Sequence, residues 1–358
     1  MRPYFRNDWG NPSSSYRFGS KIKSVLESAR EQVAALIGAN PREVVFTSCG
    51  TESNNAAIHA ALKAFPKKRH VITSAVEHSS ILNFCKLLES DGVQVTYLPV
   101  DRDGLLKLVD LENALSDETA IVSLMWANNE TGVLFPIEQI GKICKARGVL
   151  FHCDAVQAAG KLPIDVHRIP MDYLSITGHK FYSPKGIGAL YVRRKSPFTP
   201  FVCGGHQEGG RRGGTENVPL IVGLGTAAEL ARQRLPIYAE KVLGLRNELE
   251  KGILTSISDT ELNGDTERRI ANTTNITFHG VQSEALLMLL DQEGVCASSG
   301  SACLADSDEP SHVIKAMKPD SVSSQEMIRF SFGHENTMED VEQTIVSLQK
   351  SVAALRED

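Results

Sequence analysis

The alternation of strand-like and helix-like segments constrains this fold more than any other feature of the sequence. Short segments rich in β-branched and aromatic residues recur between positions 43 and 192, and amphipathic segments separate several of them. Near-continuous apolar strands spaced by helices form a mostly parallel sheet that is covered on both faces. The predicted strands are Glu43–Thr47, Val71–Ser74, Val93–Leu98, Ile121–Met125, Val149–Cys153, Tyr173–Thr177 and Gly188–Val192, and the predicted helices between them are Asn54–Ala64, Ser80–Leu88 and Ile137–Arg147.

The rest of the chain predicts a second, smaller domain. A long helical pattern runs from about Val218 to Ile257, and Pro236 is expected to break or kink it. Strand and helix patterns then alternate to the C-terminus, as in a small α+β domain. We therefore expect an α/β protein with a large domain over residues 1–235 and a small domain over residues 236–358. The small domain's predicted elements are the strand Asn275–Phe278, the helix Ser283–Leu290, the strand Met327–Ser331 and the helix Met338–Leu355.

Composition excludes several classes of partner. The 358 residues carry a formal net charge of −5, and the basic clusters are short and lack interleaved aromatic residues, so nucleic acid is not expected. No apolar run approaches the roughly 18–20 residues of a membrane-spanning helix, so we expect no membrane association. Seven cysteines without paired spacing predict reduced thiols in the cytoplasm and no metal site.

One thiol lies in a run of small polar residues, from Ser298 to Cys303. A structural cysteine is buried and inert, whereas a cysteine on a mobile, accessible loop can ionise and attack as a thiolate. The run therefore predicts a nucleophile at Cys303. A flexible loop with an incidental cysteine is the alternative.

Two polar residues follow predicted strands and fall at the same edge of the sheet, where open α/β sheets bind ligands. Lys180 can lose solvation there, which lowers its pKa and favours Schiff-base formation. Asp154 can keep a pyridinium nitrogen protonated, and a helix N-cap is its alternative role. Gln157, one helical turn after Asp154, would then reach the phenolic oxygen of a pyridoxal ring.

A phosphate site and a histidine are predicted at this edge as well. The turn at Gly50 and Thr51 precedes a helix, whose first backbone N–H groups bind anions, although such turns are frequent. The glycine-rich segment from Gly204 to Thr215 offers another close backbone approach, or simple flexibility. His78 follows a third strand, as a functional or a structural histidine. A lysine, an aspartate, a phosphate turn and a histidine on one edge together describe a pyridoxal-phosphate site.

The order and number of these motifs resemble the NifS/IscS-type cysteine desulfurases, in the class V aminotransferase branch of the type I fold of pyridoxal-phosphate-dependent transferases. The resemblance extends over almost the whole chain, and no single run is decisive. The runs that carry it are Gly10–Ser14, Gly50–Asn54, Glu77–His78, Asn128–Gly132, Asp154–Gln157, Gly178–Lys180, Arg211–Thr215, Ser298–Cys303 and Arg329–Ser331.

The resemblance implies a role for each matching residue. Lys180 would bind pyridoxal 5'-phosphate and move protons, His78 would stack on its ring and act as an acid and base, and Cys303 would accept sulfur. The implied cofactor-binding residues are Gly50, Thr51, Asn129, Asp154, Gln157, Thr177, His179, Lys180 and, from the second subunit of a homodimer, Thr215. The implied substrate-binding residues are Arg329, Asn129 and Asn11.

The resemblance also implies the reaction, in which L-cysteine becomes L-alanine and Cys303 carries the sulfur as a persulfide. An iron–sulfur scaffold or another acceptor protein would receive the sulfur, and Cys303 could contact the partner's iron–sulfur cluster. Two other interpretations remain: a selenocysteine lyase-like enzyme, and a truncated, non-catalytic paralogue that acts as a binding partner. Members of the family carry a further N-terminal segment beside the active site and a longer C-terminal tail for scaffold docking. If the protein does without the N-terminal segment, we expect weaker binding of cofactor or substrate; a misassigned or trimmed start is the alternative.

Overall fold

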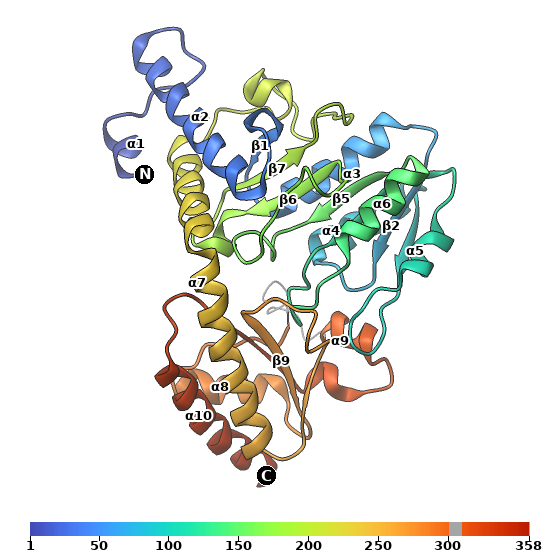
Figure 1. The fold of residues 1–358 in the computed structure, drawn as a ribbon, viewed down its shortest axis with the longest axis vertical. Helices are drawn as coiled ribbons and strands as arrows, with labels where there is room; N and C mark the ends of the chain where they lie inside the picture. The colour runs from blue at the N-terminus through green and yellow to red at the C-terminus, as the bar shows by residue number, and fades with distance from the viewer. Residues whose placement is uncertain (301–309, 358) are drawn as a thin grey trace.

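A computed structural model describes residues 1–300 and 310–357 of the chain, which form two sheets (Figure 1). The larger sheet has seven strands in the order β1-β7-β6-β5-β4-β2-β3. β7 runs antiparallel to both of its neighbours, while the other pairs are parallel, so the carboxyl ends of the parallel strands meet at one edge. The strands are β1 (Val44–Thr47), β2 (His70–Ser74), β3 (Gln94–Leu98), β4 (Thr119–Met125), β5 (Leu150–Asp154), β6 (Tyr173–Thr177) and β7 (Gly188–Val192).

Helices cover both faces of the larger sheet, which confirms the predicted α/β class. Neighbouring residues of a strand point to opposite faces. Accordingly, Tyr173 packs with α3 and α4, whereas Leu174 packs with α2, α6 and the first half of α7. Each face thus buries its own apolar cluster, and this burial drives the assembly of the layers. The helices are α2 (Arg17–Ile37), α3 (Gly50–Ala64), α4 (Ser79–Ser90), α6 (Ile137–Arg147) and α7 (Val218–Ser256).

The smaller sheet has the antiparallel order β10-β9-β8 and a core of its own. Phe278 of β9 and Leu348 of α10 pack there with Leu249, from the second half of α7. α7 therefore contributes to both cores, and its 39 residues span roughly 60 Å at 1.5 Å per residue (Figure 1). Pro236 lies inside α7 without ending it, because each half of the helix is held by a different core. The elements are β8 (Thr260–Leu262), β9 (Thr273–Phe278), α8 (Ser283–Gln292), α9 (His312–Met317), β10 (Met327–Ser331) and α10 (Met338–Glu357).

Short elements complete the fold. None of the helices within the described ranges is long and apolar enough to cross a membrane. The short helices are α1 (Arg2–Arg6) and α5 (Leu108–Ala114), and the 3₁₀ turns are η1 (Pro41–Glu43), η2 (Gly178–Phe181), η3 (Gln207–Gly210) and η5 (Val322–Gln325).

A buried ion pair anchors the glycine-rich segment against the larger sheet. Arg30 of α2 donates two hydrogen bonds, of 2.7 and 2.8 Å, to the carboxylate of Glu208. The same carboxylate accepts the backbone N–H of Phe46 in β1 at 2.9 Å. Bidentate, charge-assisted bonds of this kind fix orientation as well as position. The segment is therefore held beside the strand that leads to Gly50.

Candidate active site

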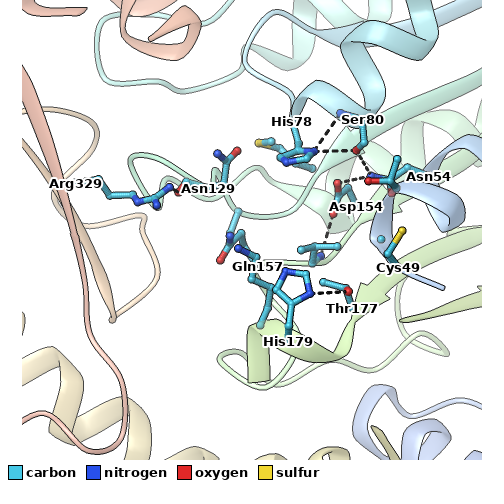
Figure 2. Close-up of a pocket in the computed structure, with 16 residues that line it drawn as sticks. Cys49, Asn54, His78, Ser80, Asn129, Asp154, Gln157, Thr177, His179 and Arg329 are labelled. Carbon is cyan, nitrogen blue, oxygen red and sulfur yellow. Dashed lines mark hydrogen bonds between the residues drawn. The ribbon is translucent and has the colours of Figure 1, made fainter. Parts of the chain in front are cut away.

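A pocket opens at the carboxyl edge of the larger sheet and faces β10 of the smaller one (Figure 2). Its walls come from the ends of β1, β2, β4, β5 and β6 and from β10. The pocket brings together most of the residues that the sequence predicts for the site, although they are far apart along the chain. These residues are Gly50, Thr51, His78, Asn129, Asp154, Gln157, Thr177, His179, Lys180 and Arg329.

The other predicted residues do not line this pocket. Asn11 is exposed, and its Oδ1 accepts the backbone N–H of Ser13 at 2.9 Å, so its side chain is engaged in a local turn. Thr215 is exposed and lines a separate pocket with Phe46. Cys303 lies outside the described residues.

Asp154 forms the end of β5 and is only 5% exposed. Its Oδ1 accepts the backbone N–H of Val156 at 2.9 Å, and its Oδ2 accepts Nδ2 of Asn54 at 2.8 Å (Figure 2). Burial raises the pKa of Asp154, and these bonds together with the charges of His78 and Lys180 act against that rise. Turns follow Asp154 in place of the helix that an N-cap role would need. The carboxylate is thus positioned for a cationic N–H in the pocket.

Lys180 lies in η2, directly after β6, at the same edge. The turn needs glycine at position 178, because a Cβ there would lie 2.7 Å from Ser183 Oγ and 2.9 Å from Leu224. Thr177 Oγ1 and His179 Nδ1 are hydrogen-bonded at 3.2 Å beside the lysine. The tight packing of this turn therefore fixes where Lys180 enters the pocket.

The start of α3 forms the anion-binding side of the pocket. Gly50 is the first residue of α3, and a Cβ at that position would lie 2.8 Å from Val156 Cγ2. Backbone N–H groups in the first turn of a helix have no partner within the helix and attract anions. Thr51, the next residue, is exposed and adds a hydroxyl. A phosphate group fits this corner.

A second lysine, which sequence reasoning missed, orients Gln157. Lys161 Nζ donates to Gln157 Oε1 at 2.6 Å. Burial, followed by repulsion from Lys180 and Arg329, lowers the pKa of Lys161 to about 7. The spacing of four residues between Gln157 and Lys161 is the only signal that the sequence offers for this contact.

Asn54 and Ser80 are further residues that sequence reasoning missed. Asn54, 1% exposed, donates through Nδ2 to Asp154 and also to Ser80 Oγ, at 2.9 Å. Ser80 in turn contacts Nδ1 of His78 through its hydroxyl at 2.9 Å and its backbone N–H at 3.1 Å (Figure 2). Asp154 and His78 are therefore connected through two intermediate side chains.

The far wall of the pocket comes from the smaller sheet. Arg329 of β10 donates through Nη1 to the backbone carbonyl of Asn129 at 2.9 Å. Arg329 also pairs with Ser298 through two backbone hydrogen bonds, of 2.7 and 3.2 Å. The Oδ1 of Asn129 is buried and has no hydrogen bond to any described residue, as expected for an acceptor that meets a ligand.

Glu77, behind the site, carries a strongly perturbed carboxyl group. It is fully buried, and its Oε1 accepts Ser74 Oγ at 2.7 Å and the backbone N–H of Met125 at 3.1 Å. Burial raises the pKa of Glu77 to about 8, mainly by disfavouring the charged form, despite those two bonds. The folded protein therefore binds a proton at Glu77 that the unfolded chain releases at lower pH.

This difference predicts a pH-dependent stability. Between about pH 4.5 and pH 8, the folded state holds the Glu77 proton and the unfolded state does not, so stability falls as pH rises through that window. Relative to Glu77→Gln, the parent should lose roughly 1.4 kcal/mol of unfolding free energy per pH unit there. Urea unfolding of both proteins at several pH values measures the difference. Parallel pH profiles would contradict an elevated pKa.

The pocket fits the pyridoxal 5'-phosphate that the sequence predicts. Lys180 supplies an amine for a Schiff base, and the buried Asp154 carboxylate suits a protonated ring nitrogen. The start of α3 at Gly50 suits the phosphate. The unpaired Oδ1 of the buried Asn129 provides a further polar contact.

Comparison with known proteins agrees with this chemistry. The family described as aminotransferase class-V matches residues 1–344. The chain is 52% identical over 356 residues to a cysteine desulfurase of Nostoc sp. strain PCC 7120, covering 99% of this chain and 89% of the relative. It is 46% identical over 357 residues to the cysteine desulfurase NifS of Azotobacter vinelandii, with the same coverage of both chains. A solved structure described as a NifS-like protein superposes with a TM-score of 0.93 at 36% identity, covering 99% of this chain and 94% of that one.

Proposed function

Because this chain belongs to the cysteine desulfurases of the class V aminotransferase family, we propose that it converts L-cysteine to L-alanine and carries the released sulfur on Cys303. The observation that carries the proposal is the pocket itself. Lys180, Asp154, His78 and Arg329 reach one cavity from four separate segments of the chain.

Pyridoxal 5'-phosphate is the proposed cofactor, and when bound it supplies an electron sink for the substrate's Cα. Lys180 holds it covalently and then moves a proton between the Cα and Cβ positions of the amino acid. Asp154, fixed by Val156 and Asn54, keeps the ring nitrogen protonated. Thr177 and His179 would hold the phosphate together with the start of α3, and Gln157 would contact the phenolic oxygen.

Arg329 is proposed to bind the substrate carboxylate. A guanidinium matches a carboxylate with two parallel N–H donors, and Arg329 projects from β10 toward the Asn129 side of the pocket (Figure 2). Its bond to the Asn129 carbonyl holds the side chain across the gap between the two sheets.

Arg329→Ala should weaken substrate binding more than it slows the later chemical steps. Loss of a charge-assisted pair predicts a KM for L-cysteine that is higher by roughly one to two orders of magnitude. Arg329→Lys keeps the charge without the bidentate geometry and should fall between parent and Ala. Steady-state alanine production against L-cysteine concentration measures both. An unchanged KM in the Ala variant would remove Arg329 from the carboxylate site.

Sulfur transfer is proposed to run through Cys303. Its thiolate attacks the sulfur of the bound cysteine, and an S–S bond forms as the Cβ–S bond breaks. The electron pair of the broken bond stays with the substrate carbon skeleton, which takes up a proton and leaves as alanine. Cys303 then carries the persulfide to an acceptor such as an iron–sulfur scaffold.

Assembly and location follow the same proposal. We propose a homodimer in which Thr215 of one protomer completes the phosphate site of its partner. The exposure of Thr215 outside its own pocket supports this arrangement. We also propose a cytoplasmic location, because the reactive thiols of the enzyme and of its protein sulfur acceptor are kept reduced there.

The direct test combines product and persulfide measurements. Purified protein loaded with pyridoxal phosphate is incubated with L-cysteine, and alanine is quantified with and without dithiothreitol. Mass measurement after trapping with a thiol reagent should find one added sulfur on the peptide that carries Cys303. Absence of alanine would leave the non-catalytic interpretation in its place.

A further inference from the structure

His78 is the N-cap of α4, and its imidazole serves as the capping group. Its Nδ1 accepts the backbone N–H of Ser80 at 3.1 Å. Capping side chains satisfy helix N–H groups that otherwise lack a partner, and losing such a cap is destabilising. A backbone N–H is only ever a donor, so the Nδ1 lone pair of His78 is committed to this bond.

The hydrogen bonds of the Ser80 hydroxyl have a defined donor and acceptor as well. The Asn54 side-chain NH₂ faces the Asp154 carboxylate, and a carboxylate only accepts hydrogen bonds. The second hydrogen of that NH₂ points to Ser80 Oγ at 2.9 Å. The Ser80 hydroxyl therefore accepts from Asn54. Because Nδ1 of His78 acts as an acceptor toward the Ser80 backbone N–H, the 2.9 Å contact directs the hydroxyl hydrogen to Nδ1 as well.

Two donors consequently converge on Nδ1 of His78. A proton on Nδ1 would face the backbone N–H of Ser80, so the capping bond would be lost and the Ser80 hydroxyl would have to turn its hydrogen away. A cation at the N-terminus of α4 would also oppose the helix dipole. A neutral imidazole carries its hydrogen on the other nitrogen, Nε2.

The charges around the ring do not reverse this preference. Asp154 of β5 favours a charged ring, whereas Lys180 of η2 and His312 of α9 oppose it. Burial is the largest influence and lowers the pKa of His78. The largest influence on the pKa of His78 therefore acts in the same direction as the capping geometry.

We infer that Asn54 and Ser80 are positioning residues that hold His78 as the neutral Nε2–H tautomer, so that His78 serves the reaction as a hydrogen-bond donor and not as a proton acceptor. The inference deepens the proposed function, and it rests on that function where it assigns His78 a part in the reaction. It replaces the acid and base role that the sequence predicts for His78 with hydrogen-bond donation through Nε2. Proton transfer at the substrate is then left to Lys180.

Nitrogen NMR of the holoenzyme tests the tautomer without using turnover. The protein is labelled with ¹⁵N-histidine and loaded with pyridoxal phosphate, and the His78 signals are assigned by their loss in His78→Asn. We expect an unprotonated Nδ1 and a protonated Nε2 at neutral pH. A protonated Nδ1, or an imidazolium, in the parent protein would overturn the inference.

The Ser80 hydroxyl is tested by matched variants in the same experiment. Ser80→Ala removes a bond to the neutral ring and should raise the pKa of His78 by roughly half to one unit. Ser80→Thr keeps the hydroxyl and should restore the parent value, while Ser79→Ala controls for a lost hydroxyl at the next position of the helix. An unchanged pKa of His78 in Ser80→Ala would exclude a role for the Ser80 hydroxyl. If that variant fails to fold, the spectrum of the parent protein alone decides whether Nδ1 is protonated. Because tautomer and alanine production are measured separately, the inference and the proposed function can fail independently.

Discussion

Cys303→Ser should lower alanine and sulfide production from L-cysteine by roughly 10³-fold or more, as expected for loss of a covalent nucleophile. A serine hydroxyl is not ionised at neutral pH, so it cannot replace a thiolate in attack on sulfur. Binding of L-cysteine should be retained, because the substitution leaves Arg329, the proposed carboxylate site, and the other described residues of the pocket unchanged. Alanine formation in the steady state and substrate-induced changes in cofactor absorbance measure the two effects separately.

The matched control is Cys296→Ser. Cys296 is an exposed free thiol seven positions earlier in the chain, and its replacement should leave turnover near the parent value.

Turnover of L-selenocysteine separates the desulfurase from the selenocysteine lyase interpretation, since selenium leaves more readily than sulfur. A Cys303→Ser variant that still releases selenium at the parent rate would favour the selenocysteine lyase interpretation. Parent-like turnover of L-cysteine would show that Cys303 is not the nucleophile.

Lys180→Ala should abolish stable loading with pyridoxal phosphate and reduce turnover by roughly 10³-fold or more, because both the Schiff base and the proton carrier are lost. Lys180→Arg keeps a cation beside Asp154 and His78 but cannot form a Schiff base, so it should be equally inactive. Absorbance of the purified proteins after reduction with borohydride reports covalent attachment directly.

Lys185→Ala is the control for this lysine. Lys185 is exposed five positions further along and does not line the pocket, so its loss should change neither loading nor turnover. Covalent loading of Lys180→Ala at the parent level would assign the Schiff base to a different amine, and Lys161, with its lowered pKa, would be the next candidate.

The sheet and its functional edge were predictable because both leave strong local signals. Strands that are covered on both faces lack the regular polar alternation of a half-exposed strand, and β6 is accordingly buried at all five of its positions. Once the strands are placed, residues such as Asp154 and Lys180 fall at one edge by topology alone. The family resemblance then supplied the roles that topology does not.

Contacts that depend on tertiary packing were not predictable. α2 was missed although its buried residues, among them Ile22, Leu26 and Val33, recur at helical spacing. The bond of Arg30 in this helix to Glu208, 178 positions away, could not be predicted from any local pattern. The bond from Asn54 to Ser80 joins two helices, and neither residue type has a distinctive pattern there. The predicted break of α7 at Pro236 is wrong: the helix continues through the proline, and two separate cores hold its halves.

The backbone pairing of Arg329 with Ser298 has a mechanical consequence. The strand that presents the proposed carboxylate clamp and the chain five residues before Cys303 form one hydrogen-bonded ribbon. Neither segment can slide along the other without breaking the two backbone hydrogen bonds between Ser298 and Arg329, of 2.7 and 3.2 Å. A shift of the Arg329 backbone on engaging a substrate would therefore be transmitted to Ser298, which links occupancy of the proposed carboxylate site to the start of the segment proposed to carry the sulfur.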